Sequence, residues 1–285
     1  METGKNSRGY EERYWEELHV THLKHDTDRD GLCGIRDDSG FKNPHERSLV
    51  WWSLAVKPDD ITSAERRLLE TTYPDRTEEQ VQMQQSFLGK FATSPAFSEL
   101  SRLGSYRFTF PLEELLEAYS QQCCSGAQPV MRVYETVLYR QQVMYVILVH
   151  SPANQELFSD RPLLTDDPNS VCSYKDGCFI WRPEAICETH SYELVKRSDE
   201  KQMEAGMVEP SRKEFYVWDH VAVALHVDRQ VLKFDPARLR QNLKYCRGAH
   251  PPIAKKFEDF PQAEEIVRKL WPDNSSPLER AEPLN

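Results

Sequence analysis

Residues 130–152, VMRVYETVLYRQQVMYVILVHSP, carry the strongest strand signal in the chain. Apolar, β-branched and aromatic residues are dense in this stretch, and such residues favour β-strands over helices. Its length fits two strands that meet near Arg140 and Gln141. The chain is therefore predicted to be strand-dominated in its middle, and any fold proposed for it must place this pair of strands in a sheet.

The remaining pattern predicts an α+β fold, because helical and strand periodicities occur side by side along the chain. Further strands are predicted at 16–24, 48–56 and 106–110, within 178–195, and in a hairpin that turns at Asp228 and Arg229. Helices are predicted at 28–37, 61–70, 77–92, 112–122, 237–245 and 262–271, with Thr62 or Ser63 as the N-cap of the second. Residues 151–177 are predicted to form a long loop, because Pro, Asp, Asn and Ser are frequent there.

Composition suggests five segments. Residues 1–15 are predicted to be a flexible N-terminus and 16–195 the main domain, followed by a charged linker at 196–213. Residues 214–271 are predicted to add a hairpin and helices, and 272–285 to be a disordered tail.

The bulk composition narrows the classes of partner and compartment. The net charge of −10 argues against general nucleic-acid binding, which depends on clustered Lys and Arg. No apolar run approaches the ~20 residues that a membrane-spanning helix needs, and the first residues lack a signal-peptide core. The seven cysteines include no CxxC pair, so we expect no metal site and reduced thiols. We therefore expect a cytoplasmic or nuclear protein that is not secreted and does not bind membranes.

The stretch HDTDRDGLCGIRDDSGF (25–41) combines three short motifs: His25-Asp26-Thr27, Gly34-Ile35 and Gly40-Phe41. It resembles the first motif of the ADP-ribosyltransferase fold, in particular its poly(ADP-ribose) polymerase branch. In that family a strand ends in His-Gly-Ser or His-Gly-Thr. A short helix then carries Gly-Ile nine and ten positions after the His, and a Gly-hydrophobic pair closes the motif.

Two later stretches extend the resemblance over roughly residues 16–195. Phe179-Ile180-Trp181, Ala185-Ile186 and Tyr192-Glu193-Leu194 follow the order of a late strand of the family. SLVWWSLAV (48–56) is a looser counterpart of the family strand that carries an aromatic residue. The resemblance implies a split antiparallel sheet with flanking helices, here with a C-terminal hairpin-helix extension. It also implies that the strands at 18–24, 48–56 and 179–195 form one connected sheet system around a cleft.

The same resemblance implies NAD as ligand or substrate, with mono-ADP-ribosyl transfer to a protein acceptor as the reaction. His25 would contact the adenosine-side ribose, and Thr27, Trp52 and Tyr145 would complete the binding site. Two departures bear on activity. Asp26 replaces the family's Gly, so its carboxylate is expected to repel the pyrophosphate side of NAD and to weaken binding. The position of the catalytic Glu falls at Gly177, which leaves Asp176 and Glu184 as the nearest carboxylates. Asp176 also suits a Lys-Asp-Gly turn, and Trp52 also suits a core position.

Two other functions compete with this one. His220 and Asp235, 15 residues apart, resemble the His-Asp pair of transglutaminase-like and papain-like hydrolases, in which the Asp orients an imidazole that activates a Cys. Cys172 and Cys33 are the candidate nucleophiles, although neither is predicted to begin a helix. The third function is a catalytically inactive module that binds a protein partner, and the resemblance to virus-induced polymerase-like proteins of vertebrates implies a role in innate immunity.

Overall fold

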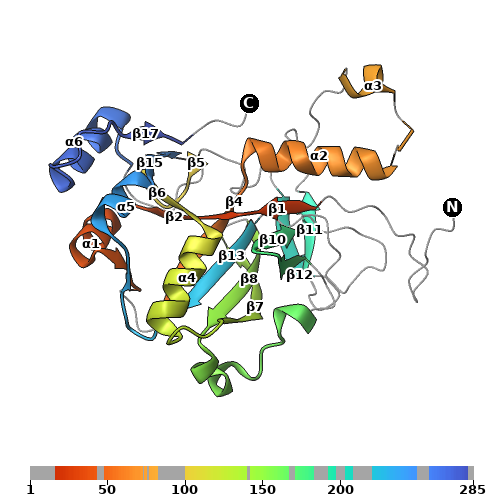
Figure 1. Ribbon diagram of the computed structural model, residues 1–285, viewed down its shortest axis with the longest axis horizontal. Coiled ribbons are helices and arrows are strands. Elements are labelled where there is room, and N and C mark those ends of the chain that lie inside the picture. Colours follow the sequence, from red (N-terminus) through yellow and green to blue (C-terminus); the bar gives the residue numbers. More distant parts are fainter. Residues whose placement is uncertain are drawn as a thin grey trace.

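The computed structural model describes residues 17–43, 48–72, 74–75, 77–82, 100–139, 142–166, 171–182, 192–196, 203–207, 220–248 and 257–281. Helices and strands alternate along these ranges, so the α+β class predicted from the sequence is confirmed. The strands of a large sheet cross the centre of the molecule, with α1, α5 and α6 grouped at one end and α2 and α3 at the other (Figure 1).

The large sheet has eight strands in the order β17-β15-β6-β2-β4-β13-β8-β7. Two neighbouring pairs, β13 with β8 and β15 with β17, are parallel, and the other pairs are antiparallel. The predicted strand pair at 130–152 is confirmed as the antiparallel edge of this sheet. The strand bounds are β2 His22–Thr27, β4 Leu49–Ala55, β6 Tyr106–Pro111, β7 Val130–Tyr139, β8 Gln142–His150, β13 His220–His226, β15 Leu243–Tyr245 and β17 Glu279–Arg280.

Smaller sheets surround the large one. Three strands pair in the order β1-β10-β9, and three further pairs are β11 with β12, β14 with β3, and β16 with β5. Their bounds are β1 Leu18–Val20, β3 Gly40–Phe41, β5 Leu100–Ser101, β9 Cys172–Lys175, β10 Cys178–Trp181, β11 Tyr192–Lys196, β12 Met203–Met207, β14 Leu232–Lys233 and β16 Arg247–Gly248. The segments predicted to share one sheet therefore lie in different ones, although only Thr21 separates β1 from β2.

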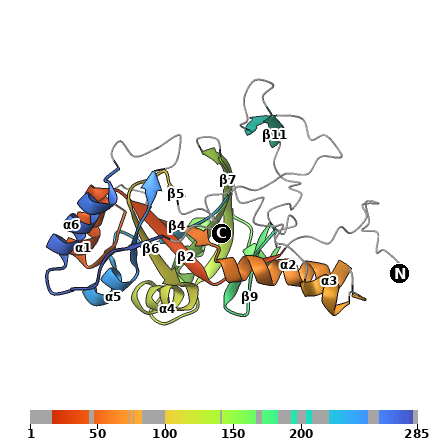
Figure 2. The same cartoon turned by 90° about the horizontal axis from the view of Figure 1, so that it is seen from above.

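The helices pack on the sheet through their apolar faces, as α4 illustrates. Helix α4 buries Leu112, Leu115, Leu116 and Tyr119, which recur every three to four residues on one helical face. It lies along one face of the large sheet (Figure 2), and Tyr119 donates its hydroxyl proton to the carbonyls of Val149 and His226 at 3.3 and 2.6 Å. The bounds are α1 Arg29–Asp38, α2 Pro58–Thr72, α3 Glu78–Gln82, α4 Leu112–Cys123, α5 Pro236–Gln241 and α6 Phe260–Leu270.

The two faces of the large sheet differ in chemistry because side chains alternate along each strand. One face, here called the core face, carries the main hydrophobic cluster, including Trp52, Phe108 and Val223. The other, here called the second face, carries a smaller apolar cluster that includes Leu148 and Ala224.

The hairpin predicted within residues 214–235 is wrong, although its turn is placed correctly. Asp228 and Arg229 do form the turn, both with positive φ. The two strands that flank it do not pair with each other, because β13 lies between β4 and β8 while β14 pairs with β3. The predicted C-terminal extension therefore supplies an inner strand of the large sheet. Val221, Val223 and Leu225 are fully buried there, which explains the insertion.

Four other segments differ from the predictions. Residues 272–281 of the predicted tail are ordered, because Leu278 and Ala281 are buried and β17 pairs with β15. Helix α2 begins at Pro58, not at Thr62 or Ser63, because Pro is favoured in the first helical turn. The predicted loop at 151–177 contains three short 3-10 helices and β9, and the predicted linker contains β12. The 3-10 helices are η2 Pro152–Asn154, η3 Glu156–Phe158 and η4 Leu164–Asp166.

Candidate functional site

The resemblance to the first transferase motif falls at the junction of β2 and α1. Strand β2 places its odd-numbered residues Leu23, His25 and Thr27 on the core face, and Lys24 and Asp26 on the second face. Helix α1 then begins behind an N-cap at Asp28, whose side chain accepts a hydrogen bond from the backbone N–H of Gly31 at 3.0 Å. The predicted strand and helix are confirmed here.

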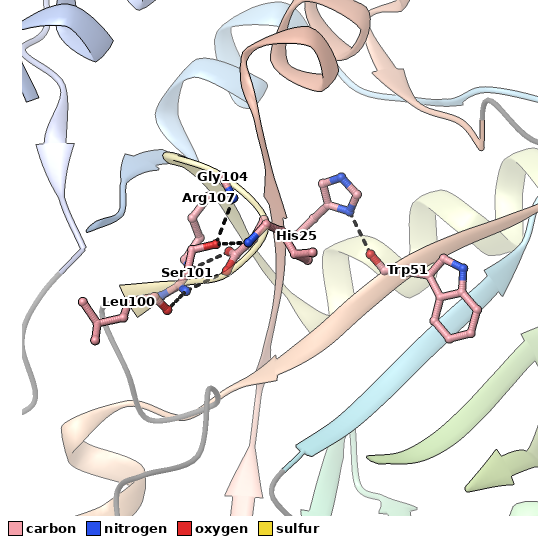
Figure 3. A network of polar contacts seen from close by, with 8 residues as sticks. His25, Trp51, Leu100, Ser101, Gly104 and Arg107 are labelled. Carbon is pink, nitrogen blue, oxygen red and sulfur yellow. Dashed lines mark hydrogen bonds and ion pairs between the residues drawn. The ribbon is translucent and has the colours of Figure 1, made fainter. Parts of the chain in front are cut away.

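His25 is held in a defined orientation by its neighbours. Its Nδ1 lies 2.8 Å from the Trp51 carbonyl oxygen, so the ring carries its proton on Nδ1 and donates it to that oxygen (Figure 3). The ring centroid lies 5.2 Å from that of Phe41 and 5.5 Å from that of Trp52. Burial lowers the pKa of His25, although the hydrogen bond to Trp51 and the Asp26 charge act in the opposite direction. His25 is therefore neutral at pH 7, and its Nε2 is a hydrogen-bond acceptor.

Asp26 points away from His25 and into an ion pair on the second face. Arg107 on β6 donates from Nε and Nη2 to the two carboxylate oxygens at 2.7 and 2.8 Å, a bidentate geometry. The two side chains are only 8% and 12% exposed. Burial alone would raise the pKa of the Asp26 carboxyl group, but the Arg107 guanidinium outweighs it and holds that pKa at about 2.

This geometry corrects one inference from the sequence. Asp26, in place of the family's Gly, was expected to repel a ligand bound beside His25. Because its charge is neutralised by Arg107 on the opposite face, it does not occupy the surface that His25 presents.

The turn at residues 100–105 holds this ion pair in place. Arg107 also donates from Nη2 to the Leu100 carbonyl at 3.2 Å, and the Ser101 hydroxyl oxygen accepts from the backbone N–H of Leu103 and Gly104 at 3.1 and 3.4 Å (Figure 3). A Cβ added at Gly104 would lie 2.1 Å from the Thr27 carbonyl oxygen. The turn therefore packs directly against the backbone where β2 ends, and only glycine fits at that contact.

Lys24 lies beside the ion pair and is 3% exposed. Burial lowers the pKa of its ammonium group to about 7, and the Arg107 guanidinium contributes in the same direction, while Asp26 opposes both. Lys24 is thus a buried amine that is partly neutral at physiological pH. The sequence indicated neither Lys24 nor Arg107 as a site residue, because the environment of both depends on the pairing of β2 with β6. Asp26 and Arg107, which this pairing brings together, are 81 residues apart in the sequence.

The depressed pKa of Lys24 predicts a pH-dependent stability. Between pH 7, near the pKa of Lys24 in the folded chain, and pH 10.5, its ordinary pKa, Lys24 is protonated in the unfolded chain and mostly deprotonated in the folded chain. The free energy of unfolding therefore rises with pH over this range. Between pH 7 and pH 9 the free energy of unfolding should rise by about 2 kcal/mol more in the wild type than in Lys24→Met. Urea denaturation at both pH values measures this difference, and parallel changes in the two proteins would contradict it.

Two of the other predicted binding residues are core residues. Trp52 lies next to His25, so the structure brings these two together, but its side chain is 1% exposed. Tyr145 on β8 is fully buried, two strands away from β4. Thr27 ends β2 and is half-buried, and a Cβ on Gly31 would overlap its hydroxyl. Of these three, Thr27 remains at the margin of the surface that His25 presents.

Of the two predicted carboxylates, the structure describes Asp176, which lies in a turn away from β2. Asp176 is exposed in the two-residue turn between β9 and β10, with φ of 51° at Asp176 and 81° at Gly177. Such a turn favours Asp-Gly and explains the residue without a catalytic role. Its strands belong to the sheet of β1, not to that of β2. Glu184 lies outside the described residues.

The proposed hydrolase pair also receives no support from the strand pairing. His220 begins β13, and Asp235 follows β14, which pairs with β3 instead of returning along β13. The Asp235 carboxylate accepts from the Ala237 backbone N–H at 2.7 Å and is the N-cap of α5. The six described cysteines form no disulfide, and of the two candidate nucleophiles Cys172 is buried in β9 while Cys33 lies within α1.

The described residues were considered as metal ligands and as membrane-spanning helices. Its His, Cys, Asp and Glu residues form no group of three or more that could hold a metal ion. None of the helices in the described ranges is long and apolar enough to cross a bilayer.

Comparison of the chain with known proteins found no match. No protein-family model matches the chain, no curated protein matches it, and no solved structure matches its fold.

Proposed function

We propose that this chain is an ADP-ribosyltransferase-like protein that binds NAD or an ADP-ribose-like group beside His25, at the end of β2. One observation carries the proposal. The Nδ1 proton of His25 is donated to the Trp51 carbonyl, and Nε2 has no partner among the described residues. A neutral imidazole nitrogen accepts a hydrogen bond, and a ribose hydroxyl is a matching donor. In the family that the motif resembles, this His contacts the adenosine-side ribose.

The spatial arrangement of the motif supports the proposal. Its first and last parts meet, because the His25 ring packs edge-on against Phe41, 5.2 Å between centroids. Between them Ile35 is buried on the inner side of α1, and the C-cap Ser39 adopts a left-handed conformation that turns the chain into β3. The aromatic contacts hold the imidazole in one orientation before a ligand arrives, which reduces the entropy lost on binding.

The proposal is limited to recognition of the ligand. Transfer of an ADP-ribosyl group would require a carboxylate near the nicotinamide-side ribose. The Asp26 charge reaches His25, but its carboxylate is bound by Arg107, and Asp176 lies in the turn of a different sheet. Mono-ADP-ribosyl transfer would therefore depend on residues outside the described ranges, such as Glu184.

Calorimetric titration with NAD and with ADP-ribose tests the proposal. His25→Phe keeps a ring against Phe41 and Trp52 but removes both nitrogens, so we expect its affinity to fall about tenfold, the value of one hydrogen bond. His22→Phe is the matched control, because His22 lies on the same strand and the opposite face, where its Nε2 contacts the Lys57 ammonium group at 3.1 Å. It should bind like the wild type.

Two results would overturn the proposal. One is the absence of binding heat in the folded wild type, and the other is equal affinity of the wild type and a folded His25→Phe variant. Circular dichroism melts of each variant establish that the loss, if seen, is not a loss of fold.

A further inference from the structure

A cluster of basic side chains lies on the second face of the large sheet, at the carboxyl ends of β8 and β13. These are the two inner strands of the described sheet that pair in parallel. Strands β8 and β13 run in the same direction, with Val149 paired to Leu225, so His150 and His226 follow as neighbours at their carboxyl ends. Neighbouring strands lie about 4.8 Å apart. In sheets with parallel strands, the carboxyl ends are where ligands commonly bind. This cluster lies on the face opposite to that of His25.

Arg132 is the charged centre of the cluster. It lies on β7, is 6% exposed, and donates from Nε to His150 Nε2 at 2.9 Å and from Nη1 to the Arg161 carbonyl at 2.6 Å. Both acceptors are neutral, and no carboxylate in the described ranges pairs with this guanidinium. The arginine side chain is a positively charged group with five N–H donors and no acceptor. Among the described residues, this buried positive charge therefore has no counter-ion, and burying a charge without one is costly.

The two histidines cannot supply the missing negative charge, and His226 adds a hydrogen-bond donor. His150 accepts at Nε2 from Arg132 and donates from Nδ1 to the Ser151 carbonyl at 2.8 Å, which fixes it as neutral. His226 Nδ1 lies 3.1 Å from Asn154 Nδ2, and acceptance there places the His226 proton on Nε2. Burial lowers the pKa of both histidines, and the Arg132 charge contributes for His150.

The side chains around His150 and His226 strengthen the electrostatic attraction between Arg132 and an anion bound there. The Phe158 ring lies against both histidines, with centroid distances of 5.0 Å to His150 and 5.1 Å to His226. It reduces contact with water, so a charge nearby is screened less than at the open surface. Arg161 brings a second guanidinium, which donates to the Tyr134 carbonyl and lies 5.0 Å from the centroid of the Tyr134 ring. Its Nε also lies 3.4 Å from the exposed Asp160 carboxylate.

We infer that Arg132, His150, His226 and Arg161 form a binding site for a phosphate group. Among the described residues, no partner binds Arg132 Nη2 or His226 Nε2, so each of these side chains offers a single donor nitrogen. Both flat edges of the Arg132 guanidinium are already used in part, because Nε and Nη1 have partners. A planar carboxylate gains most from an intact two-nitrogen edge, whereas a tetrahedral phosphate accepts one bond from each of several donors. Phosphate is therefore the anion whose shape fits this arrangement.

Binding of inorganic phosphate to the full chain tests the inference. At 10 mM, phosphate should raise the melting temperature of the wild type by about 2–4 °C over sodium chloride or acetate of equal ionic strength. Arg132→Gln should lose this shift, and ³¹P line broadening should show an affinity at least about tenfold weaker. Phosphoserine is titrated in parallel, since competition by it would identify an esterified phosphate as the source and its failure would identify the free ion.

Arg240→Gln is the matched control. Arg240 is also 6% exposed and also donates to a carbonyl, that of Ser276, but the acidic side chains of Glu279 and Glu264 lie near it. This variant should keep the phosphate shift. Equal loss in the two variants would mean a general charge effect and would overturn the inference, as would a wild type that phosphate stabilises no more than chloride does.

A measurement on the wild type alone covers the case in which Arg132→Gln does not fold. Phosphate should shift the imidazole NMR signals of His226 and leave those of His22 unchanged, because His22 lies on a different strand beside Lys57. Unchanged His226 signals at saturating phosphate would overturn the inference. The proposed NAD site is tested separately, because Arg132→Gln should bind NAD like the wild type and His25→Phe should keep the phosphate shift.

Discussion

Replacing Arg107 by methionine should lower the free energy of unfolding at neutral pH by about 3–5 kcal/mol. The variant keeps most of the side-chain volume but leaves the Asp26 carboxylate buried without its bidentate partner. An uncompensated buried charge costs far more than the pair contributes when intact. Urea denaturation of both proteins at pH 7, followed by circular dichroism, measures the difference.

The pH dependence of this loss identifies its cause. With Arg107 present, the pKa of Asp26 is about 2, so its carboxylate contributes stability above its ordinary pKa of 3.8, and this contribution is lost as the pH falls toward 2. Without Arg107 that pKa rises, so the difference between wild type and Arg107→Met should shrink as the pH falls below about 4. A difference that stays constant from pH 7 to pH 3 would contradict the charge explanation.

An exposed ion pair supplies the control for Arg107. Arg238 donates to both carboxylate oxygens of Glu114, but the two side chains are 40% and 29% exposed. Arg238→Met should therefore cost at most about 1 kcal/mol. The double variant Asp26→Leu with Arg107→Met should recover much of the stability lost in Arg107→Met, because it removes the unpaired Asp26 carboxylate.

Truncation of Trp52 to alanine should cost about 3–5 kcal/mol, the range for large aromatic residues in a core. The ring is 1% exposed and lies 4.8 Å from Phe41 and 5.9 Å from Phe110 between centroids. Trp52→Phe should cost clearly less, because the buried Nε1 of Trp52 has no hydrogen-bond partner among the described residues and nothing polar is lost. Urea denaturation again provides the measurement.

The neighbouring tryptophan is the matched control for this experiment. Trp51 points to the second face and is 36% exposed, so Trp51→Ala should cost about 1 kcal/mol or less. Equal losses for the two alanine variants would mean that the assignment of faces along β4 is wrong. A large loss at Trp52 alone would agree with its burial in the core, which removes it from the binding site that the sequence resemblance implies.

Much of the local structure follows from the sequence by itself. The density of β-branched and aromatic residues predicted the β7–β8 pair, and the spacing of apolar residues predicted α4. The turn at Asp228 and Arg229 and helix α1, whose N-cap is Asp28, follow from residues that favour turns and N-caps. These features rest on hydrogen bonds and contacts between residues close along the chain, so a short window of sequence contains the information that decides them.

Only the tertiary structure decided which strands pair and, as a result, which side chains contact each other. The sequence identified His25, but not that Trp51 would fix its tautomer, that Asp26 would bind Arg107, or that His150 would accept from Arg132. The insertion of β13 between β4 and β8 was likewise absent from the prediction, since Val221, Val223 and Leu225 would suit a hairpin equally well. The free energy of pairing depends on the apolar area that the whole sheet buries, and no local pattern of residues contains that sum.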